Sequence, residues 1–394
     1  MDGTFAIGLS AGQGKEGQVM GPLQLAARSE LSLAALSIDE VRDAALIWKS
    51  LTDLSQDAWF WHTWANMQFN LVAAQKYEAR NLSFFVLQGG KPVGVVPLMV
   101  NRVTVGDVSG CEASYYGGPL PWPALLPGVP ELEALENFAF FELETRVREA
   151  QAERIRLRLE PPTPTHTDQQ RLEQRVKQNQ YLDSSYVSHH MTLEADTLVQ
   201  VRERYRRYVK KFAPAYQLSI ADGEAVTAAL EETYFHLHVK DAGGQFRSRE
   251  SYTLQCDLAR AGEAFFVVAR NRGANAIAGM LLVSLYKGSA YDNSVAVDPA
   301  FQQEYVSHLL KWTAIEELLR RGAQSYELGP KAESSSFMSL PSEKSRGISY
   351  FKEGWTRHSV RRVGVAEKFL SARLLQAVMK AQVDALQEYF GVRG

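Results

Sequence analysis

Two carboxylates in the last third of the chain occur where acid–base chemistry is possible. Asp292 lies in the stretch Ser289–Val297, which predicts a strand, and Glu327 lies in a second predicted strand, Gln324–Leu328. A carboxylate within hydrogen-bond reach of an amine can take its proton or orient it. We therefore expect Asp292 to be a candidate base and Glu327 an alternative, with ordinary turn or strand-edge positions left open for both. No Gly-x-Ser-x-Gly pattern occurs, which favours direct group transfer over a covalent intermediate.

A second group of chemically capable residues is the pattern Arg247-x-Arg249-x-x-Tyr252. Arginine recognises phosphate and carboxylate groups through two parallel hydrogen bonds. We expect Arg247, Arg249 and Tyr252 to contact a substrate, and a solvated basic loop is the alternative.

A basic helix is predicted between residues 202 and 212. It carries six basic residues and one acidic residue. Such a cluster can follow RNA phosphates in a protein whose net charge is only −2. The donor-binding candidates on it are Arg206, Arg207, Lys210 and Lys211, and a solvated helix face is the alternative.

Aromatic residues in the first half are weaker candidates for substrate contacts. Trp61 and Trp64 share a face if their segment is helical, and core packing is the favoured explanation for the pair. Tyr116 lies in the glycine-containing stretch Ser114–Pro119, where backbone can approach a ligand closely or simply turn. The adjacent His189 and His190 would point to opposite faces of a strand, so we predict no metal site.

The elements that must position these residues form two similar halves. The sequences of Phe84–Leu98 and Phe265–Leu282 both predict a β-hairpin, and a predicted helical segment precedes each of them. This recurrence predicts a flexible leader at 1–31, a first domain at 32–190, and a second domain at 191–394. The apolar residues of the tail, 367–389, have helical spacing and predict a C-terminal helix. Two cysteines in unrelated contexts fit a reducing cytoplasm. No apolar run is long enough to span a membrane.

The order of elements from Ser289 onward resembles the acyl-donor half of GNAT acyltransferases. A strand ends at Val-x-Pro (297–299), a helix follows to about Arg321, and the strand at 324–328 comes next. In acyl-CoA enzymes of this type a glycine-rich turn before the helix holds a pyrophosphate. Here the turn is 302–307, which has no glycine and contains Glu304. The order indicates acyl transfer, and the turn argues against ordinary acetyl-CoA.

Five segments in a fixed order resemble the Fem-type acyltransferases, a family of tandem GNAT proteins that includes aminoacyl-tRNA-dependent enzymes. They are residues 188–193, the basic helix 202–212, 247–252, 309–322 and 347–354. The resemblance implies an α/β (α+β) fold of two GNAT-like domains, each a mixed sheet flanked by helices. Pro214 directly follows the basic helix, so we expect no long helical arm.

The resemblance also implies roles for residues near the second domain's strands. Lys352 matches the lysine of the family's Phe-Lys pair, which lies near the acyl-donor end. We expect it to hold a phosphate or stabilise an oxyanion, and Phe351 to stack on a base or line the acyl channel. Tyr291 and Asp292 fall where the strand is expected to separate from its neighbour. A surface position remains the alternative for Lys352.

Together these features predict a cytoplasmic N-acyltransferase that forms an amide without a bound cofactor or metal. The favoured co-substrate is aminoacyl-tRNA, and the acceptor is an amine on a cell-wall precursor or small peptide metabolite. One alternative uses acyl-CoA or an acyl-carrier protein and acts on an amino sugar or amino acid. The other is a non-catalytic binding module on a decayed GNAT fold. We expect a monomer or homodimer whose first domain lacks transferase activity and shapes the acceptor side of the site.

Overall fold

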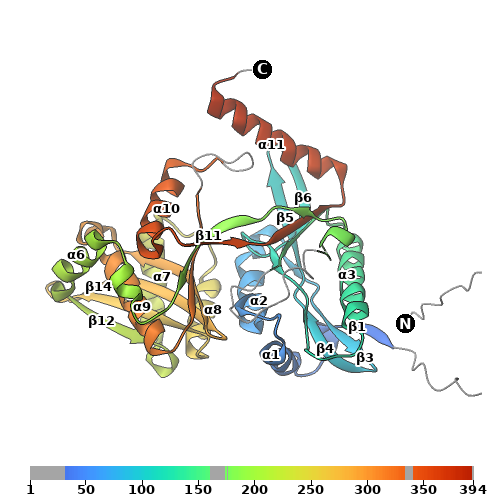
Figure 1. Cartoon of the computed structure of the whole chain (residues 1–394), viewed down its shortest axis with the longest axis horizontal. Coiled ribbons are helices and arrows are strands. Elements are labelled where there is room, and N and C mark those ends of the chain that lie inside the picture. The colour runs from blue at the N-terminus through green and yellow to red at the C-terminus, as the bar shows by residue number, and fades with distance from the viewer. Residues whose placement is uncertain (1–31, 160–173, 175, 333–339, 393–394) are drawn as a thin grey trace, which may run out of the picture.

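The computed structural model describes residues 32–159, 174, 176–332 and 340–392, and the predicted leader lies outside them. Two lobes, each built on β-sheet with helices packed against it, lie side by side (Figure 1). Each lobe contains parallel and antiparallel strand pairs, so the predicted mixed α/β architecture is confirmed.

The first lobe contains two sheets. The smaller has the order β1-β3-β4-β8, with strands Leu33–Ser37, Phe84–Gln88, Lys91–Val96 and Ala124–Leu125. The larger has the order β10-β18-β9-β6-β5-β2, with β7 (Leu120–Pro121) also beside β9. Its strands are Leu182–Asp183, Val365–Phe369, Arg154–Arg158, Val108–Ala113, Met99–Val105 and Arg80–Asn81. Helices α1 (Ala44–Leu54), α2 (Trp64–Ala73), α3 (Leu132–Glu149) and α11 (Ala372–Phe390) accompany them.

The second lobe has one sheet of order β12-β13-β14-β15-β16-β11-β17. The strands are Tyr216–Ala221, Ala264–Asn271, Ala276–Tyr286, Ser289–Val297, Ser325–Pro330, Tyr186–Thr192 and Val360–Val363. Its helices are α5 (Thr197–Gln200), α6 (Glu203–Phe212), α7 (Ala228–Ala242), α8 (Arg249–Arg260), α9 (Val306–Arg320) and α10 (Glu343–Thr356).

Both faces of this sheet are covered, as the alternation along β13 requires. Phe265 and Val267 belong to the core beneath α6 and α9, whereas Phe266 and Val268 belong to the core beneath α7 and α8. Successive side chains of a strand point to opposite faces, so a strand buried on both sides becomes a continuous apolar run.

The two lobes exchange strands across the position where we expected the domain boundary. Strand β11 spans residues 190 and 191 and pairs with β16 and β17 in the second lobe. The chain then returns at Val365, where β18 pairs with β9 in the first lobe. A single cut at residue 190 therefore does not separate the two lobes.

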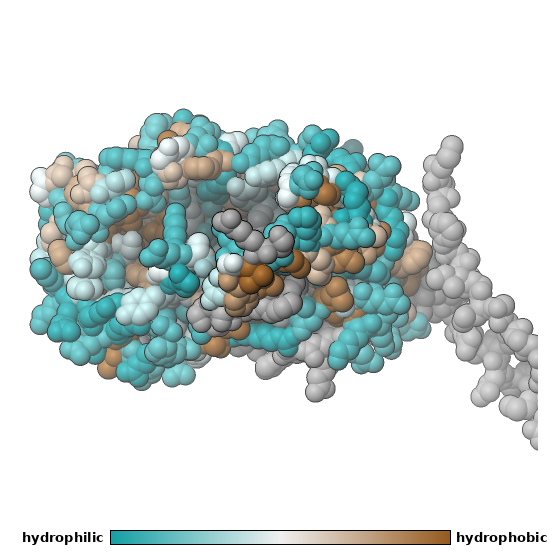
Figure 2. Space-filling view, turned by 90° about the horizontal axis from the view of Figure 1, so that it is seen from above, coloured by the Kyte–Doolittle hydropathy of each residue, from teal (hydrophilic) through white to brown (hydrophobic). Residues whose placement is uncertain are grey.

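The C-terminal helix α11 lies at the top of Figure 1 and packs on the first lobe near β5, β6 and β18. Leu374 is buried there, whereas the farther half exposes Met379, Val383, Tyr389 and Phe390. Figure 2 views the molecule from this side and shows a mostly hydrophilic face with hydrophobic residues gathered near its middle. No helix in the described ranges has the length and apolar character needed to cross a membrane.

Candidate active site

The candidate site begins where β15 and β16 separate. These parallel strands pair only through Ser289↔Ser325, Ala290↔Tyr326 and Tyr291↔Glu327. Beyond Tyr291, β15 keeps its pairing with β14 up to Val297 but no longer pairs with β16. The β15 edge after Tyr291 therefore has backbone groups that the parallel ladder leaves unused. Such groups can bind an acyl carbonyl or a peptide-like donor.

Asp292, at the point of separation, is held by two groups from the second lobe. Lys311 Nζ on α9 lies 2.5 Å from its Oδ1, and the Tyr326 hydroxyl donates to the same oxygen over 3.0 Å. Lys311 is buried, and the resulting desolvation lowers its pKa although Asp292 opposes the shift. With Oδ1 held by two donors, the Asp292 carboxylate is fixed in place and can orient neighbouring groups.

Glu327 is also satisfied, by groups from two different sheets. Arg158 Nη2 of β9 donates to Oε2 over 2.8 Å, and the Ser188 hydroxyl of β11 donates to Oε1 over 2.8 Å. The side chains of Arg158 and Glu327 are 7% and 1% exposed, so this is a desolvated ion pair between the lobes. Such a pair fixes geometry, and breaking it would leave a buried charge alone.

Trp61 covers this ion pair from the first lobe. Its ring lies 4.7 Å from the Tyr291 ring, and the Arg158 guanidinium lies 5.1 Å from the Trp61 ring. Trp64 goes elsewhere and packs against Trp48 in the first lobe's core. The two tryptophans diverge because the segment is not one helix: a 3-10 turn covers 60–62, and Thr63 is extended and caps α2.

Lys352 is on α10, with its Nζ close to the backbone of β16. A Cβ placed on Gly329 would lie 2.9 Å from this Nζ, and the φ of +93° at Gly329 favours glycine at this position. Burial lowers the Lys352 pKa, and the nearby Asp292 and Glu327 carboxylates act against that shift. Among the described residues, none hydrogen-bonds or pairs with Nζ. Lys352 is therefore a half-buried positive charge available to a substrate.

Phe351 points away from Lys352 into the packing between α6 and α9. Its ring lies 5.0 Å from His308 and 5.8 Å from Tyr205. The turn before α9 is filled by similar rings: Tyr305 stacks on Tyr208 of α6 at 4.0 Å. Glu304 accepts a hydrogen bond from the Tyr216 hydroxyl. A carboxylate and a stacked tyrosine pair thus occupy the region where a glycine-rich turn would present N–H groups to pyrophosphate.

The Arg247-x-Arg249-x-x-Tyr252 group splits in two. The Arg247 guanidinium lies 4.4 Å from the Tyr252 ring and donates to Gln255 over 3.2 Å. Gln255 in turn donates to Asn293 on β15 over 3.1 Å, which links Arg247 to the splayed strand. Arg249 instead pairs with Glu232 of α7. Only Arg247 and Tyr252 of the three are connected to the separated strands.

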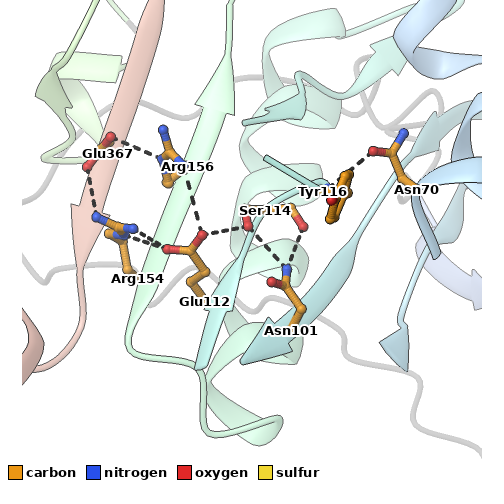
Figure 3. Close-up of polar contacts among 8 residues, drawn as sticks. All are labelled: Asn70, Asn101, Glu112, Ser114, Tyr116, Arg154, Arg156 and Glu367. Atoms are coloured by element: carbon orange, nitrogen blue, oxygen red, sulfur yellow. Dashed lines mark hydrogen bonds and ion pairs between the residues drawn. The ribbon is translucent and has the colours of Figure 1, made fainter. Parts of the chain in front are cut away.

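The first lobe has a ladder of arginines along β9 that leads to the site. Arg154, Arg156 and Arg158 alternate along the strand and so face one way. Figure 3 shows Arg154 and Arg156 with Glu112 and Glu367; Arg154 Nε lies 2.7 Å from Glu112 and Arg156 Nε lies 3.2 Å from Glu367. The third rung, Arg158, reaches Glu327 in the other lobe.

Tyr116 lies on the α2 side of the same view. Its backbone N–H donates to Asn70 over 3.2 Å, and its ring lies 6.3 Å from that of Tyr77. The neighbouring Tyr115 hydroxyl donates to the carbonyl of Trp61 over 3.2 Å. The predicted glycine-containing turn therefore supports the segment that carries Trp61.

The basic residues on α6 face outward around a buried side formed by Tyr205 and Val209. Arg207 is 72% exposed and lies 3.8 Å from Glu203, whereas Arg206 turns toward α10 and lines a cavity there. Lys210 and Lys211 lie in the last turn of the helix. Among the described residues, no cluster of three or more His, Cys, Asp or Glu side chains could hold a metal.

Comparison with known proteins identifies the fold. Residues 199–336 match the family model of the acetyltransferase (GNAT) domain, and no curated protein sequence matches the chain. The crystal structure of FemX superposes with a TM-score of 0.59 and 12% identity, covering 85% of this chain and 98% of FemX. A C-terminal domain assigned to a lysylphosphatidylglycerol synthetase of Agrobacterium fabrum superposes at 0.54 and 12% identity, covering 87% and 96%. The chain has the tandem GNAT fold, arranged as in FemX.

Proposed function

We propose that the protein is an N-acyltransferase that joins an activated aminoacyl group to an amine by direct transfer. The observation that carries the proposal is the position of the half-buried Lys352, which has no partner among the described residues, near the carboxylates where β15 and β16 separate. A positive charge in a low-dielectric site, beside a strand edge that the parallel ladder leaves uncovered, is suited to stabilise an oxyanion as it develops.

The proposed step balances without a protein base. The amine nitrogen attacks the ester carbonyl carbon, and the C–N bond forms as the oxygen gains negative charge beside Lys352. The C–O bond to the ribose then breaks, and the proton lost by the amine passes to the departing ribose oxygen. Asp292 and Glu327 orient this site, since each already accepts hydrogen bonds from two partners. In this proposal Arg247 holds the acceptor, and the buried Tyr252 ring supports its guanidinium.

Aminoacyl-tRNA is the favoured donor, because the turn before α9 is filled. The Tyr305–Tyr208 stack and Glu304 occupy the region in which acyl-CoA enzymes bind pyrophosphate. The basic face of α6 beside this turn suits an RNA donor. The acceptor amine belongs to a cell-wall precursor or a small peptide metabolite.

Donor binding tests the proposal most directly. The full chain is titrated with aminoacylated tRNA and with acetyl-CoA at two salt concentrations. We expect salt-sensitive binding of the charged tRNA and no response to acetyl-CoA. Tight acetyl-CoA binding would overturn the donor assignment. The K352M variant is expected to stay folded and lose turnover. Donor binding without turnover in the wild type, and unchanged binding in K352M, would favour a binding module over an enzyme.

A further inference from the structure

An open cavity of about 360 Å³ lies between the start of α6 and the end of α10. Polar side chains at these two helix ends line it: Arg202, Glu203, Arg206, Glu353, Arg357 and His358. The two helices are held together at its base, where the Arg202 N–H donates to the Gly354 carbonyl over 2.9 Å. A Cβ on Gly354 would lie 2.2 Å from the Tyr205 ring, so only glycine permits this contact. The cavity therefore has a fixed floor.

Two of the arginines that line this cavity have no acidic partner among the described residues. Glu353 accepts from His358 over 2.8 Å and lies 3.8 Å from Arg202. Glu203 is 3.8 Å from Arg207, outside the cavity. Among the described residues, no acidic side chain pairs with Arg206 or Arg357. The Arg206 Nε is buried without any hydrogen-bond partner. A buried, unsatisfied guanidinium nitrogen is costly unless a ligand satisfies it.

An exposed aromatic ring lies beside the cavity. Tyr350 is 51% exposed, and the guanidiniums of Arg202 and Arg204 lie 4.4 and 5.1 Å from its ring. An exposed ring framed by arginines, next to a pocket for an anion, is the combination with which proteins bind single-stranded nucleic acid. The arginines also hold the ring in place, since each can stack on it.

The helix α10 connects this surface to the candidate active site. Tyr350, Glu353 and Arg357 are three, four and seven residues apart and so share a face. Lys352 is two residues from Tyr350 and faces β16 instead. A single-stranded nucleic acid bound over Tyr350 is thus separated from Lys352 by the width of one helix. Its last nucleotides can span that width.

We propose that this cavity binds a phosphodiester of a single-stranded RNA end, while Tyr350 stacks on an adjacent base. The RNA end then continues around α10 and places its terminal ester at Lys352. The inference rests on the proposed function, because it assigns the part of the molecule that holds the single-stranded end of an aminoacyl-tRNA donor.

Binding of a short fluorescein-labelled single-stranded RNA to the full chain, followed by anisotropy over a salt series, tests it. Arg206→Gln removes a charge from the cavity, and Arg207→Gln removes the same charge from the same helix outside it. We expect R206Q to weaken binding more than R207Q and to lower the salt slope by roughly 0.7, as for one lost phosphate contact on a single strand. Tyr350→Ala is expected to weaken binding roughly tenfold with the salt slope unchanged.

Equal weakening by R206Q and R207Q would overturn the cavity assignment, because only a diffuse field would then act. If the wild type still transferred aminoacyl groups from charged tRNA in that case, the proposed function would stand. Loss of affinity in R206Q with an unaltered salt slope would also contradict the assignment. Failure of the wild type to bind any RNA, with turnover from acetyl-CoA, would remove both proposals together.

Discussion

The imidazole of His62 makes the candidate site sensitive to acid. The ring is buried and bonded at both nitrogens. Its Nδ1 accepts a hydrogen bond from the Trp59 N–H over 3.0 Å, so the proton is on Nε2, which donates to the Trp122 carbonyl over 2.7 Å. A proton on Nδ1 would replace that acceptor with a second donor facing an N–H. Burial lowers the pKa of His62 from 6.5 to about 4. The neutral ring is thus part of the structure that holds the adjacent Trp61.

The sign and size of the pH effect follow from this shift. Between pH 6.5 and 4 the unfolded chain binds a proton at His62 and the folded chain does not, so acid favours unfolding. Evaluating the proton linkage at both pH values, His62 alone lowers the free energy of unfolding by about 2 kcal/mol from pH 7 to pH 5. Other buried histidines with lowered pKa values, including His189 and His308, add to the total in the wild type.

The variant H62Q isolates this contribution. Free energies of unfolding from urea titrations at pH 7 and pH 5 are compared for the wild type and H62Q, whatever their absolute stabilities. We expect the difference between the two pH values to be about 2 kcal/mol smaller in H62Q. The matched control is H236Q, which removes an exposed imidazole from α7. If the free energy of unfolding fell equally from pH 7 to pH 5 in the wild type and in H62Q, the argument that a buried neutral imidazole is responsible would be refuted.

Three further predictions concern lysines. K352M is expected to lose turnover without losing stability, because burial opposes the charge of Lys352. K352R should keep its activity at high pH, where the activity of the wild type falls because the pKa of Lys352 is lowered. The pH–rate profiles of kcat/KM check both expectations. K311M should destabilise the fold by about 3–5 kcal/mol by leaving the Asp292 carboxylate unpaired, and the double variant K311M/D292N should recover part of this in urea titrations. K287M should lower the melting temperature, because Lys287 Nζ donates to the carbonyls of Thr52 and Ser55 over 2.6 and 2.5 Å; an unchanged melting temperature would show that this contact between lobes contributes nothing.

Local patterns predicted the elements whose signals lie within a few residues. The stretch 289–297 forms β15 with the expected bounds, and both predicted hairpins are present as β3/β4 and β13/β14. The basic stretch forms α6, and Pro214 follows it in a short 3-10 turn without a long arm. Alternation, turn residues and helical spacing are properties of the segment itself, so sequence alone sufficed.

Elements that depend on distant partners were not predictable in this way. Residues 367–369 fit the helical spacing of the tail, but they form the end of β18 because β9 supplies hydrogen-bond partners about 200 residues away. Lys311 was not singled out, since nothing near it marks a buried lysine; its partner Asp292 comes from another element. The alternating arginines of β9 were visible, and that pattern is a usable signal for a charged sheet face.

The distribution of the site over both lobes changes how the first domain is understood. It was expected only to shape the acceptor side, yet it supplies Arg158 and Trp61 to the place where β15 and β16 separate. Without Arg158, Glu327 would be a buried carboxylate held only by the Ser188 hydroxyl. A buried charge without its ion-pair partner is destabilising. Strand β18 begins two residues after β17 ends in the second lobe, and its first residue, Val365, pairs with Arg158; this connection holds Arg158 near Glu327. The first lobe is therefore a structural part of the candidate active site, whether or not it touches a substrate.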